Sequence, residues 1–145
     1  MRPGVADTAA FCARYGVAPE DSANTIVVVS RRRRRRHAAC VLLATTCLDV
    51  NRTVCRLLDV TKASFESAAQ TRELTGMLIG GVTPFGLPED LPVFVDARVM
   101  ARPTVVLGGG TRSAKLRIGP QELLRLPSAI VVDGLALEPS PAGSA

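Results

Sequence analysis

The chain has 145 residues, of which 47% are hydrophobic, 21% charged and 3% aromatic. This composition fits a globular domain with an aliphatic core and does not fit a disordered chain, whose composition would be poorer in apolar residues. The net charge of +5 is concentrated in six consecutive arginines, because the remaining Lys and Arg nearly balance the 13 acidic residues. We expect one domain over residues 1–136 and a disordered tail, rich in Pro, Ser, Ala and Gly, over residues 137–145.

Membrane and metal-binding classes are disfavoured by what the sequence lacks. The longest apolar run, residues 38–48, is too short to cross a bilayer, and no apolar targeting segment opens the chain. The only histidine is His37, and no two cysteines have Cys-x-x-Cys spacing, so we expect no metal site and no catalytic Cys–His pair. We expect a cytoplasmic protein without a cofactor, whose cysteines are reduced and buried: Cys12, Cys40, Cys47 and Cys55.

The first expected elements are a short helix and a pair of strands. Asp7 is a suitable N-cap for a helix that ends near Gly16, and residues 19–22 are typical of a turn. The β-branched run at 25–29 and the apolar run at 38–46 predict two interior strands. The arginines lie between them, so the sequence predicts a hairpin with a basic tip.

This basic tip is a candidate contact for a nucleic-acid backbone. Like charges side by side cannot be buried, so the run must be solvated. Each Arg–phosphate contact would release a counterion and give salt-dependent binding. The alternative is a solvated loop without a ligand. The candidate residues are Arg31, Arg32, Arg33, Arg34, Arg35 and Arg36.

Two helices and a short strand are expected next. Asp49 is placed to cap a helix whose apolar face contains Val50, Val54, Leu57 and Leu58. Residues 61–65 predict a short strand, and residues 66–74 predict a second helix that closes near Gly76.

A glycine-rich loop at residues 75–88 is the strongest candidate for a binding site. Gly80 and Gly81 allow positive φ and let another molecule approach the bare backbone. Pro84 and Pro88 fix φ on either side, so the loop is constrained. A rigid loop with exposed amides suits a small polar group, and the alternative is a tight turn with no ligand.

The remaining elements favour a mixed sheet. Residues 92–95 predict a strand, and residues 104–107 and 115–118 predict a hairpin around a second glycine stretch. A helix through residue 126 and a strand at 129–132 follow. The second glycine stretch lacks the residue order of a P-loop. Adjacent strands with interspersed helices predict an α+β fold rather than a regular βαβ fold.

Five segments resemble the YbaK/ProX family in sequence and in order, beginning at Asn24, Ala38, Leu74, Val105 and Ile118. The most specific is residues 74–87, Leu-Thr-Gly-Met-Leu-Ile-Gly-Gly-Val-Thr-Pro-Phe-Gly-Leu. The resemblance covers residues 7–132. Members are free-standing relatives of the editing insertion of bacterial prolyl-tRNA synthetase. The resemblance therefore implies a mixed, partly barrel-like sheet surrounded by helices, and a strand before the first helix that this sequence does not show.

The resemblance also implies an activity, hydrolysis of the ester between a tRNA and a wrong, small amino acid. The family's Gly-x-x-x-Pro loop would hold the aminoacyl group and terminal adenosine, and its amides would stabilise an oxyanion without a metal. A second glycine stretch would line the opposite wall. The implied partners are aminoacyl-tRNA and a synthetase, with no membrane. The substrate-binding residues would be Gly80, Gly81, Val82, Thr83 and Pro84 in the loop, and Gly108, Gly109 and Gly110 opposite.

Two positions depart from the family pattern. The family's lysine aligns with Asn24, which donates hydrogen bonds but carries no charge, and a serine of the family aligns with Gly108. Lys62 is the nearest alternative cation in sequence. The expected function is a trans-acting aminoacyl-tRNA deacylase with Asn24, Gly80 and Gly81 as catalytic candidates. Two alternatives stay open, namely an inactive tRNA- or nucleotide-binding module, and a regulatory protein that binds a free amino acid or nucleotide.

Overall fold

The structure, a computed structural model, describes residues 19–31, 36–78, 81–111 and 114–138. The helix expected at residues 7–16, arginines 32–35, Gly80 and residues 139–145 of the expected tail lie outside this range. In chain order the elements are the 3₁₀ turn η1 (Pro19–Asp21), β1 (Ala23–Ser30), β2 (Arg36–Leu43), β3 (Cys47–Leu48), the π-helical turn η2 (Val50–Val54), α2 (Cys55–Leu58), β4 (Ser64–Phe65), α3 (Ala68–Thr75), β5 (Val93–Asp96), α4 (Ala97–Met100), β6 (Val105–Gly108), β7 (Lys115–Ile118), the 3₁₀ helix η3 (Pro120–Arg125), β8 (Ala129–Val132) and β9 (Ala136–Leu137).

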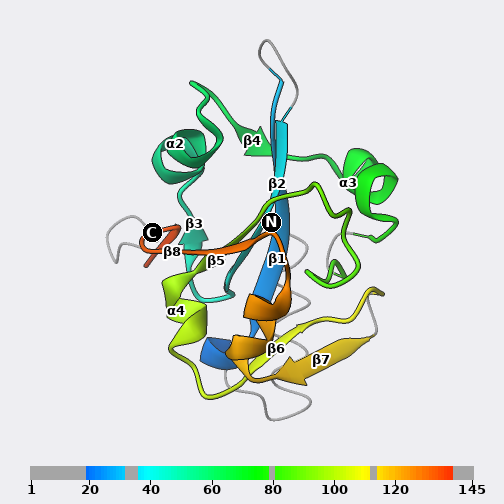
Figure 1. The fold of residues 1–145 in the computed structure, drawn as a ribbon, viewed down its shortest axis with the longest axis vertical. Helices are drawn as coiled ribbons and strands as arrows, with labels where there is room; N and C mark the ends of the chain where they lie inside the picture. The colour runs from blue at the N-terminus through cyan, green and yellow to red at the C-terminus, as the bar shows by residue number, and fades with distance from the viewer. Residues whose placement is uncertain (1–18, 32–35, 79–80, 112–113, 139–145) are drawn as a thin grey trace.

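A mixed five-stranded sheet in the order β4-β1-β2-β5-β8 forms the centre of the molecule (Figure 1). β1 is antiparallel to β2 and to β4, whereas β5 is parallel to both β2 and β8. The hairpin β6–β7 and the pair β3–β9 are separate two-stranded sheets, and in the described residues no sheet closes into a barrel. The expected α+β fold with a mixed sheet is therefore confirmed.

The expected hairpin of β1 and β2 is present and its register brings Ser30 opposite Arg36. β2 is buried on both faces, which explains its continuous apolar sequence. Ala39, Val41 and Leu43 belong to one core cluster, and the alternate residues Ala38, Cys40 and Leu42 belong to a second. Burial raises the pKa of the Cys40 thiol to about 12, so this cysteine is an inert part of the core.

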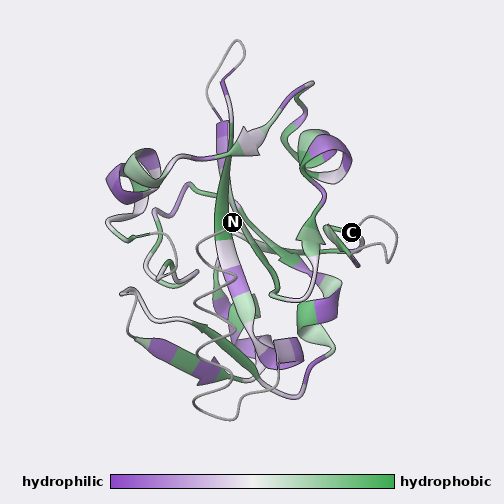
Figure 2. Ribbon diagram, turned by 180° about the vertical axis from the view of Figure 1, so that it is seen from behind, coloured by the Kyte–Doolittle hydropathy of each residue, from purple (hydrophilic) through white to green (hydrophobic). Residues whose placement is uncertain are grey.

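The two helices that follow the hairpin lie on opposite sides of it, α2 on one side and α3 on the other, in both views of the ribbon (Figures 1 and 2). Leu58 of α2 packs into the second core cluster. Leu74 of α3 and Phe85 of the glycine-rich loop pack against the first cluster. The glycine-rich loop therefore lies on the α3 side of the central hairpin. Among the helices of the described residues, none has the length and apolar character needed to cross a bilayer.

Several expected boundaries differ from those observed. β2 ends at Leu43 rather than at 46, because the amide and hydroxyl of Thr46 both donate to the Leu43 carbonyl and close a turn. Asp49 is at the expected N-cap position, before η2, but its carboxylate accepts a hydrogen bond from the Thr53 hydroxyl and caps no backbone amide. Ser67 caps α3 by accepting from the amide of Gln70. Leu137, expected in the tail, is paired with Cys47 in β3–β9.

Candidate functional site

The two glycine stretches meet in the structure, backbone against backbone. Gly108 ends β6, and a Cβ atom at this position would lie only 2.6 Å from the carbonyl oxygen of Val82 and 3.1 Å from the carbonyl carbon of Gly81. The amide of Gly110 donates a 2.9 Å hydrogen bond to the carbonyl oxygen of Gly81. Gly110 has φ = +101°, a conformation that favours glycine. Glycine is thus required here by the close approach of a loop that is distant in sequence.

The C-terminus of α3 positions the first glycine stretch. Gly76 closes the helix with φ = 74° and its amide donates to the carbonyl of Arg72. The hydroxyl of Thr75 donates to the Thr71 carbonyl and accepts from the amide of Met77, so the chain leaves the helix in a fixed direction.

The backbone amides available to a ligand differ from those expected. The amides of Gly81, Gly109 and Gly110 are already engaged, donating to the carbonyls of Leu78, Ala114 and Gly81. The next two amides of the loop, those of Val82 and Thr83, have no backbone acceptor within the described part of the chain. Both residues are buried, at 5% and 8% exposure. Two successive donors in buried residues, without a backbone acceptor among the described residues, are suited to hold a carbonyl oxygen or another small anion.

Asn24 belongs to β1, the strand next to the hairpin β6–β7. β6 lies beside β1, and a parallel bridge joins Ser22 to Val106. In the register of β1 and β2, Asn24 lies opposite Leu42 of the second core cluster, so its side chain is on the same face of β1 as Ile26 and Val28. Asn24 is half-buried. The structure thus brings the loop at Gly81–Val82 against Gly108, whereas Lys62 is exposed on the connection between α2 and β4.

Two arginines of the basic tip are described, and both bind the body of the protein. Arg31 Nη2 lies 2.5 Å from Glu66 Oε1, and Arg36 Nη1 donates to the Leu58 carbonyl at 2.7 Å. Glu66 Oε2 also hydrogen-bonds His37 Nε2 at 2.6 Å, and Glu66 Oε1 accepts from the Ser67 amide at 2.9 Å. From its sequence context Glu66 was predicted only to begin a helix, and this cluster was not predicted because the partners of Glu66 are distant in sequence.

The Glu66 carboxylate is fully buried and ionised in this cluster. Burial alone would raise the pKa of this carboxyl. The hydrogen bonds from the Ser67 amide, His37 and Arg31, with the charge of Arg31, outweigh burial and lower the pKa below its ordinary value of 4.5. The cluster therefore contributes to stability only while Glu66 is ionised.

We expect the free energy of unfolding to fall as the pH is lowered below about 4.5. The pKa is lower in the folded state, so the stabilisation is present above the unfolded-state pKa and is lost as the pH falls through the folded-state value. This loss of stability is measured by denaturant unfolding of the wild type and of Glu66→Gln between pH 3 and pH 7. Glu20→Gln, which alters an exposed side chain, is the control. The difference between wild type and Glu66→Gln should be about 1–3 kcal/mol at pH 7 and shrink in acid. A difference that stays constant over this range would contradict the assignment.

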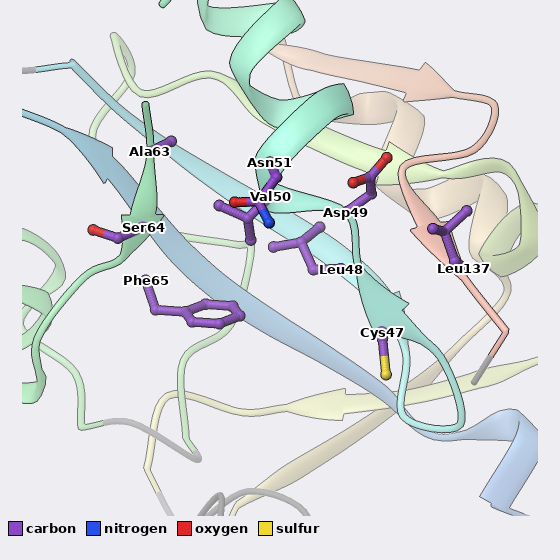
Figure 3. Close-up of a pocket in the computed structure, with 9 residues that line it drawn as sticks. All are labelled: Cys47, Leu48, Asp49, Val50, Asn51, Ala63, Ser64, Phe65 and Leu137. Atoms are coloured by element: carbon purple, nitrogen blue, oxygen red, sulfur yellow. The ribbon is translucent and has the colours of Figure 1, made fainter. Parts of the chain in front are cut away.

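A cavity of about 380 Å³ lies apart from the glycine stretches, between β3, η2 and β4 (Figure 3). Its lining contains none of the site residues expected from the sequence. The lining residues are Cys47, Leu48, Asp49, Val50, Asn51, Ala63, Ser64, Phe65 and Leu137. The described residues contain no group of three or more His, Cys, Asp or Glu placed to hold a metal ion.

Comparisons with known proteins agree with this architecture. A family model described as an aminoacyl-tRNA editing domain matches residues 2–126. The hypothetical protein APE2540 is 28% identical, with a TM-score of 0.79 over 90% of this chain and 83% of its own. A candidate trans-editing enzyme for prolyl tRNA synthetase is also 28% identical, with a TM-score of 0.76 over 87% of this chain and 77% of its own. The uncharacterized protein YwhH of Bacillus subtilis (strain 168) is 39% identical over 62 residues, which span 43% of this chain and only 40% of YwhH.

Proposed function

Because the chain belongs to the family of aminoacyl-tRNA editing domains, we propose that it is a trans-acting deacylase that hydrolyses the ester of a tRNA mischarged with a small amino acid. The observation that carries this proposal is the contact of Gly108 with the Gly81–Val82 backbone, next to two amides that have no backbone acceptor in the part of the chain that the structure describes. The proposal includes a single domain over residues 1–136 that acts in the cytoplasm on tRNA delivered by a synthetase. The likeness to a candidate trans-editing enzyme supports it.

The amides of Val82 and Thr83 fit the requirement of ester hydrolysis. Water adds to the ester carbonyl carbon, and negative charge develops on the carbonyl oxygen. The bond from this carbon to the ribose oxygen then breaks, which releases the tRNA hydroxyl and the free amino acid. Preorganised backbone donors that stabilise such an oxyanion each contribute a factor of about 10²–10³ to the rate. In this proposal Val82 and Thr83 supply the donors, and Gly80, Gly81 and Pro84 shape the loop that presents them.

Asn24 and the second glycine stretch would complete the substrate site. The Asn24 carboxamide carries both a donor and an acceptor, and its strand β1 lies next to β6, the strand that ends at Gly108. The close packing at Gly108 leaves little room next to the loop, which favours a small aminoacyl group and excludes larger ones by size. Gly110 holds the loop through its hydrogen bond to the Gly81 carbonyl, and Gly109 donates to the Ala114 carbonyl across the hairpin. The basic tip would bind the tRNA backbone.

The second candidate function is a tRNA-binding module that does not cleave its ligand, favoured by the uncharged Asn24 where the family has lysine. We expect wild type to deacylate mischarged tRNA, and Asn24→Ala to lower kcat/KM about tenfold through the loss of one substrate hydrogen bond. Asn24→Lys tests the alternative, because an inactive module should gain turnover when the cation is restored. The assay is the release of radiolabelled amino acid from charged tRNA. An inactive wild type with an active Asn24→Lys would overturn the deacylase proposal.

A further inference from the structure

We propose that Arg31 is a phosphate contact on the side of the molecule that carries the glycine loop, and that Glu66 is the positioning residue that holds it there. This inference rests on the proposed binding of tRNA and names which part of the tRNA is bound. It concerns the Arg31–Glu66–His37 cluster, which the proposed ester hydrolysis does not use.

The cluster fixes Arg31 more firmly than an exposed ion pair would. The Glu66 side chain is fully buried and accepts hydrogen bonds from Arg31, His37 and the Ser67 amide. Its own amide donates to the Val27 carbonyl at 2.9 Å, which joins Glu66 to β1 by the backbone as well. A carboxylate held at this many points can hold the guanidinium in one orientation, as an exposed carboxylate cannot.

Arg31 retains donors for a second anion. A guanidinium has five N–H donors in a planar fork, and Glu66 engages the Nη2 end. The Arg31 side chain is 47% exposed, whereas that of Glu66 is not exposed at all. The protein therefore presents a partly exposed, oriented guanidinium, which suits the recognition of a phosphate group.

The same carboxylate also ties Arg31 to the glycine loop. Ser67, whose amide donates to Glu66, is the N-cap of α3. α3 has eight residues, or a length of about 12 Å, and it ends at Gly76, where the loop begins. Residues 66–76 thus form one hydrogen-bonded strut between Arg31 and the loop, on the α3 side of the hairpin (Figures 1 and 2). Arg36, in contrast, binds the last turn of α2 on the opposite side.

The distance from Arg31 to the proposed site indicates which phosphate it meets. Asn24 and Arg31 are separated by seven residues of an extended strand, which is about 23 Å at ~3.3 Å per residue. Stacked nucleotides are spaced by about 3.4 Å, so this distance corresponds to about seven of them. Arg31 would therefore bind the acceptor stem and have no contact with the terminal adenosine.

The test compares the binding of uncharged tRNA to wild type, Arg31→Gln, Glu66→Gln and Glu66→Asp as a function of salt, with thermal melts of each variant. Arg31→Gln is expected to weaken binding about tenfold and to reduce the salt slope by about 0.7–0.9, the value for one phosphate contact. Both Glu66 variants should weaken binding severalfold, because Gln lacks the charge and Asp keeps it but is one methylene too short to hold Arg31 in place. Arg56→Gln removes an exposed arginine of α2 and should leave binding within about twofold of wild type.

Three results would overturn the proposal. Tighter binding by Glu66→Gln would mean that the carboxylate only neutralises Arg31. If Glu66→Asp bound tRNA as tightly as wild type, the position in which the carboxylate holds Arg31 would be unimportant. Equal losses of tRNA affinity in Arg31→Gln and Arg56→Gln would reveal only a general charge effect. Arg31→Gln alters an exposed side chain and keeps the test valid if a Glu66 variant unfolds.

A second substrate separates this inference from the deacylase proposal. A short aminoacylated 3′ fragment lacks the acceptor stem, so its hydrolysis should be equal in wild type and Arg31→Gln. If wild type binds tRNA through Arg31 but hydrolyses neither substrate, the deacylase proposal fails and the phosphate contact stands. If wild type hydrolyses both substrates and Arg31→Gln changes neither reaction nor binding, the phosphate contact fails and the deacylase stands.

Discussion

Gly108→Ala is expected to lower the rate of deacylation at least about 100-fold, the cost of a displacement of roughly 1 Å in a catalytic loop. The added Cβ would lie 2.6 Å from the Val82 carbonyl oxygen, 3.1 Å from the Gly81 carbonyl carbon and 3.2 Å from the Gly81 carbonyl oxygen. All three are backbone atoms, so the loop itself must move, and with it the amides of Val82 and Thr83. Overpacking of this kind should also lower the free energy of unfolding by about 1–3 kcal/mol. Deacylation kinetics and denaturant unfolding measure the two effects.

Gly119→Ala is the matched control for this substitution. Its Cβ would approach only the end of the Gln121 side chain, at 2.7 Å from Nε2, and that flexible side chain can move away. We expect wild-type kinetics and a change in stability within about 0.5 kcal/mol, as for a surface substitution. If Gly108→Ala were as active and as stable as Gly119→Ala, the contact between the two glycine stretches would not control the site.

Replacement of Arg32, Arg33, Arg34 and Arg35 by Gln is expected to have the second largest effect, on tRNA binding. In the sequence these four arginines lie between Arg31 and Arg36, the two that bind the body of the protein. Loss of four phosphate contacts should reduce the slope of log K against log salt by about 3–4, at ~0.7–0.9 for each contact. Affinity at low salt should fall by about 10². Titration with labelled, uncharged tRNA at 50–200 mM salt measures both quantities.

The control variant removes the same charge from dispersed, exposed positions. Its slope should change by less than about 1, because these side chains do not converge on one stretch of phosphates. Equal losses of slope in the two variants would show that net charge, and not the basic tip, determines binding. The control positions are Arg52, Arg56, Arg72 and Arg125.

The central hairpin and the glycine stretches were predictable from the sequence because their signals are local. The β-branched run of β1 and the apolar run of β2 require only neighbouring residues to be recognised, and the register of the pair confirms them. Gly-Gly followed by Thr-Pro likewise indicates a constrained loop without any structural information. The family resemblance placed these signals in the same order, and the family is confirmed by the match over residues 2–126.

What the sequence did not reveal depends on contacts between distant residues. The need for glycine at 108 arises from a carbonyl group of Val82, and nothing near Gly108 in the sequence indicates it. Glu66 resembles an ordinary residue at the start of a helix until the fold brings Arg31 and His37 to it. The short elements α4, β3 and β9 span only two to four residues each, too few to show a hydrophobic period.

The sequence also could not show which backbone amides of the loop are available to a ligand. The family resemblance implied that amides of the loop from Gly80 to Pro84 stabilise an oxyanion, with Gly81 among the catalytic candidates. The structure instead engages the Gly81 amide with the Leu78 carbonyl and leaves those of Val82 and Thr83 without a backbone acceptor in the portion of the chain that it describes. Gly81 correctly indicated where the loop lies. Hydrogen bonds within the loop determine which of its amides remain available as donors.

The most direct test of the account is the rate at which the wild-type protein releases amino acid from tRNA charged with alanine, cysteine or serine. We expect release from at least one of these well above the spontaneous rate, saturable in tRNA and reduced at least about 100-fold in Gly108→Ala. Spontaneous rates for all three, with tRNA still bound in a salt-dependent manner, would contradict the account and identify the chain as a binding module on an editing scaffold.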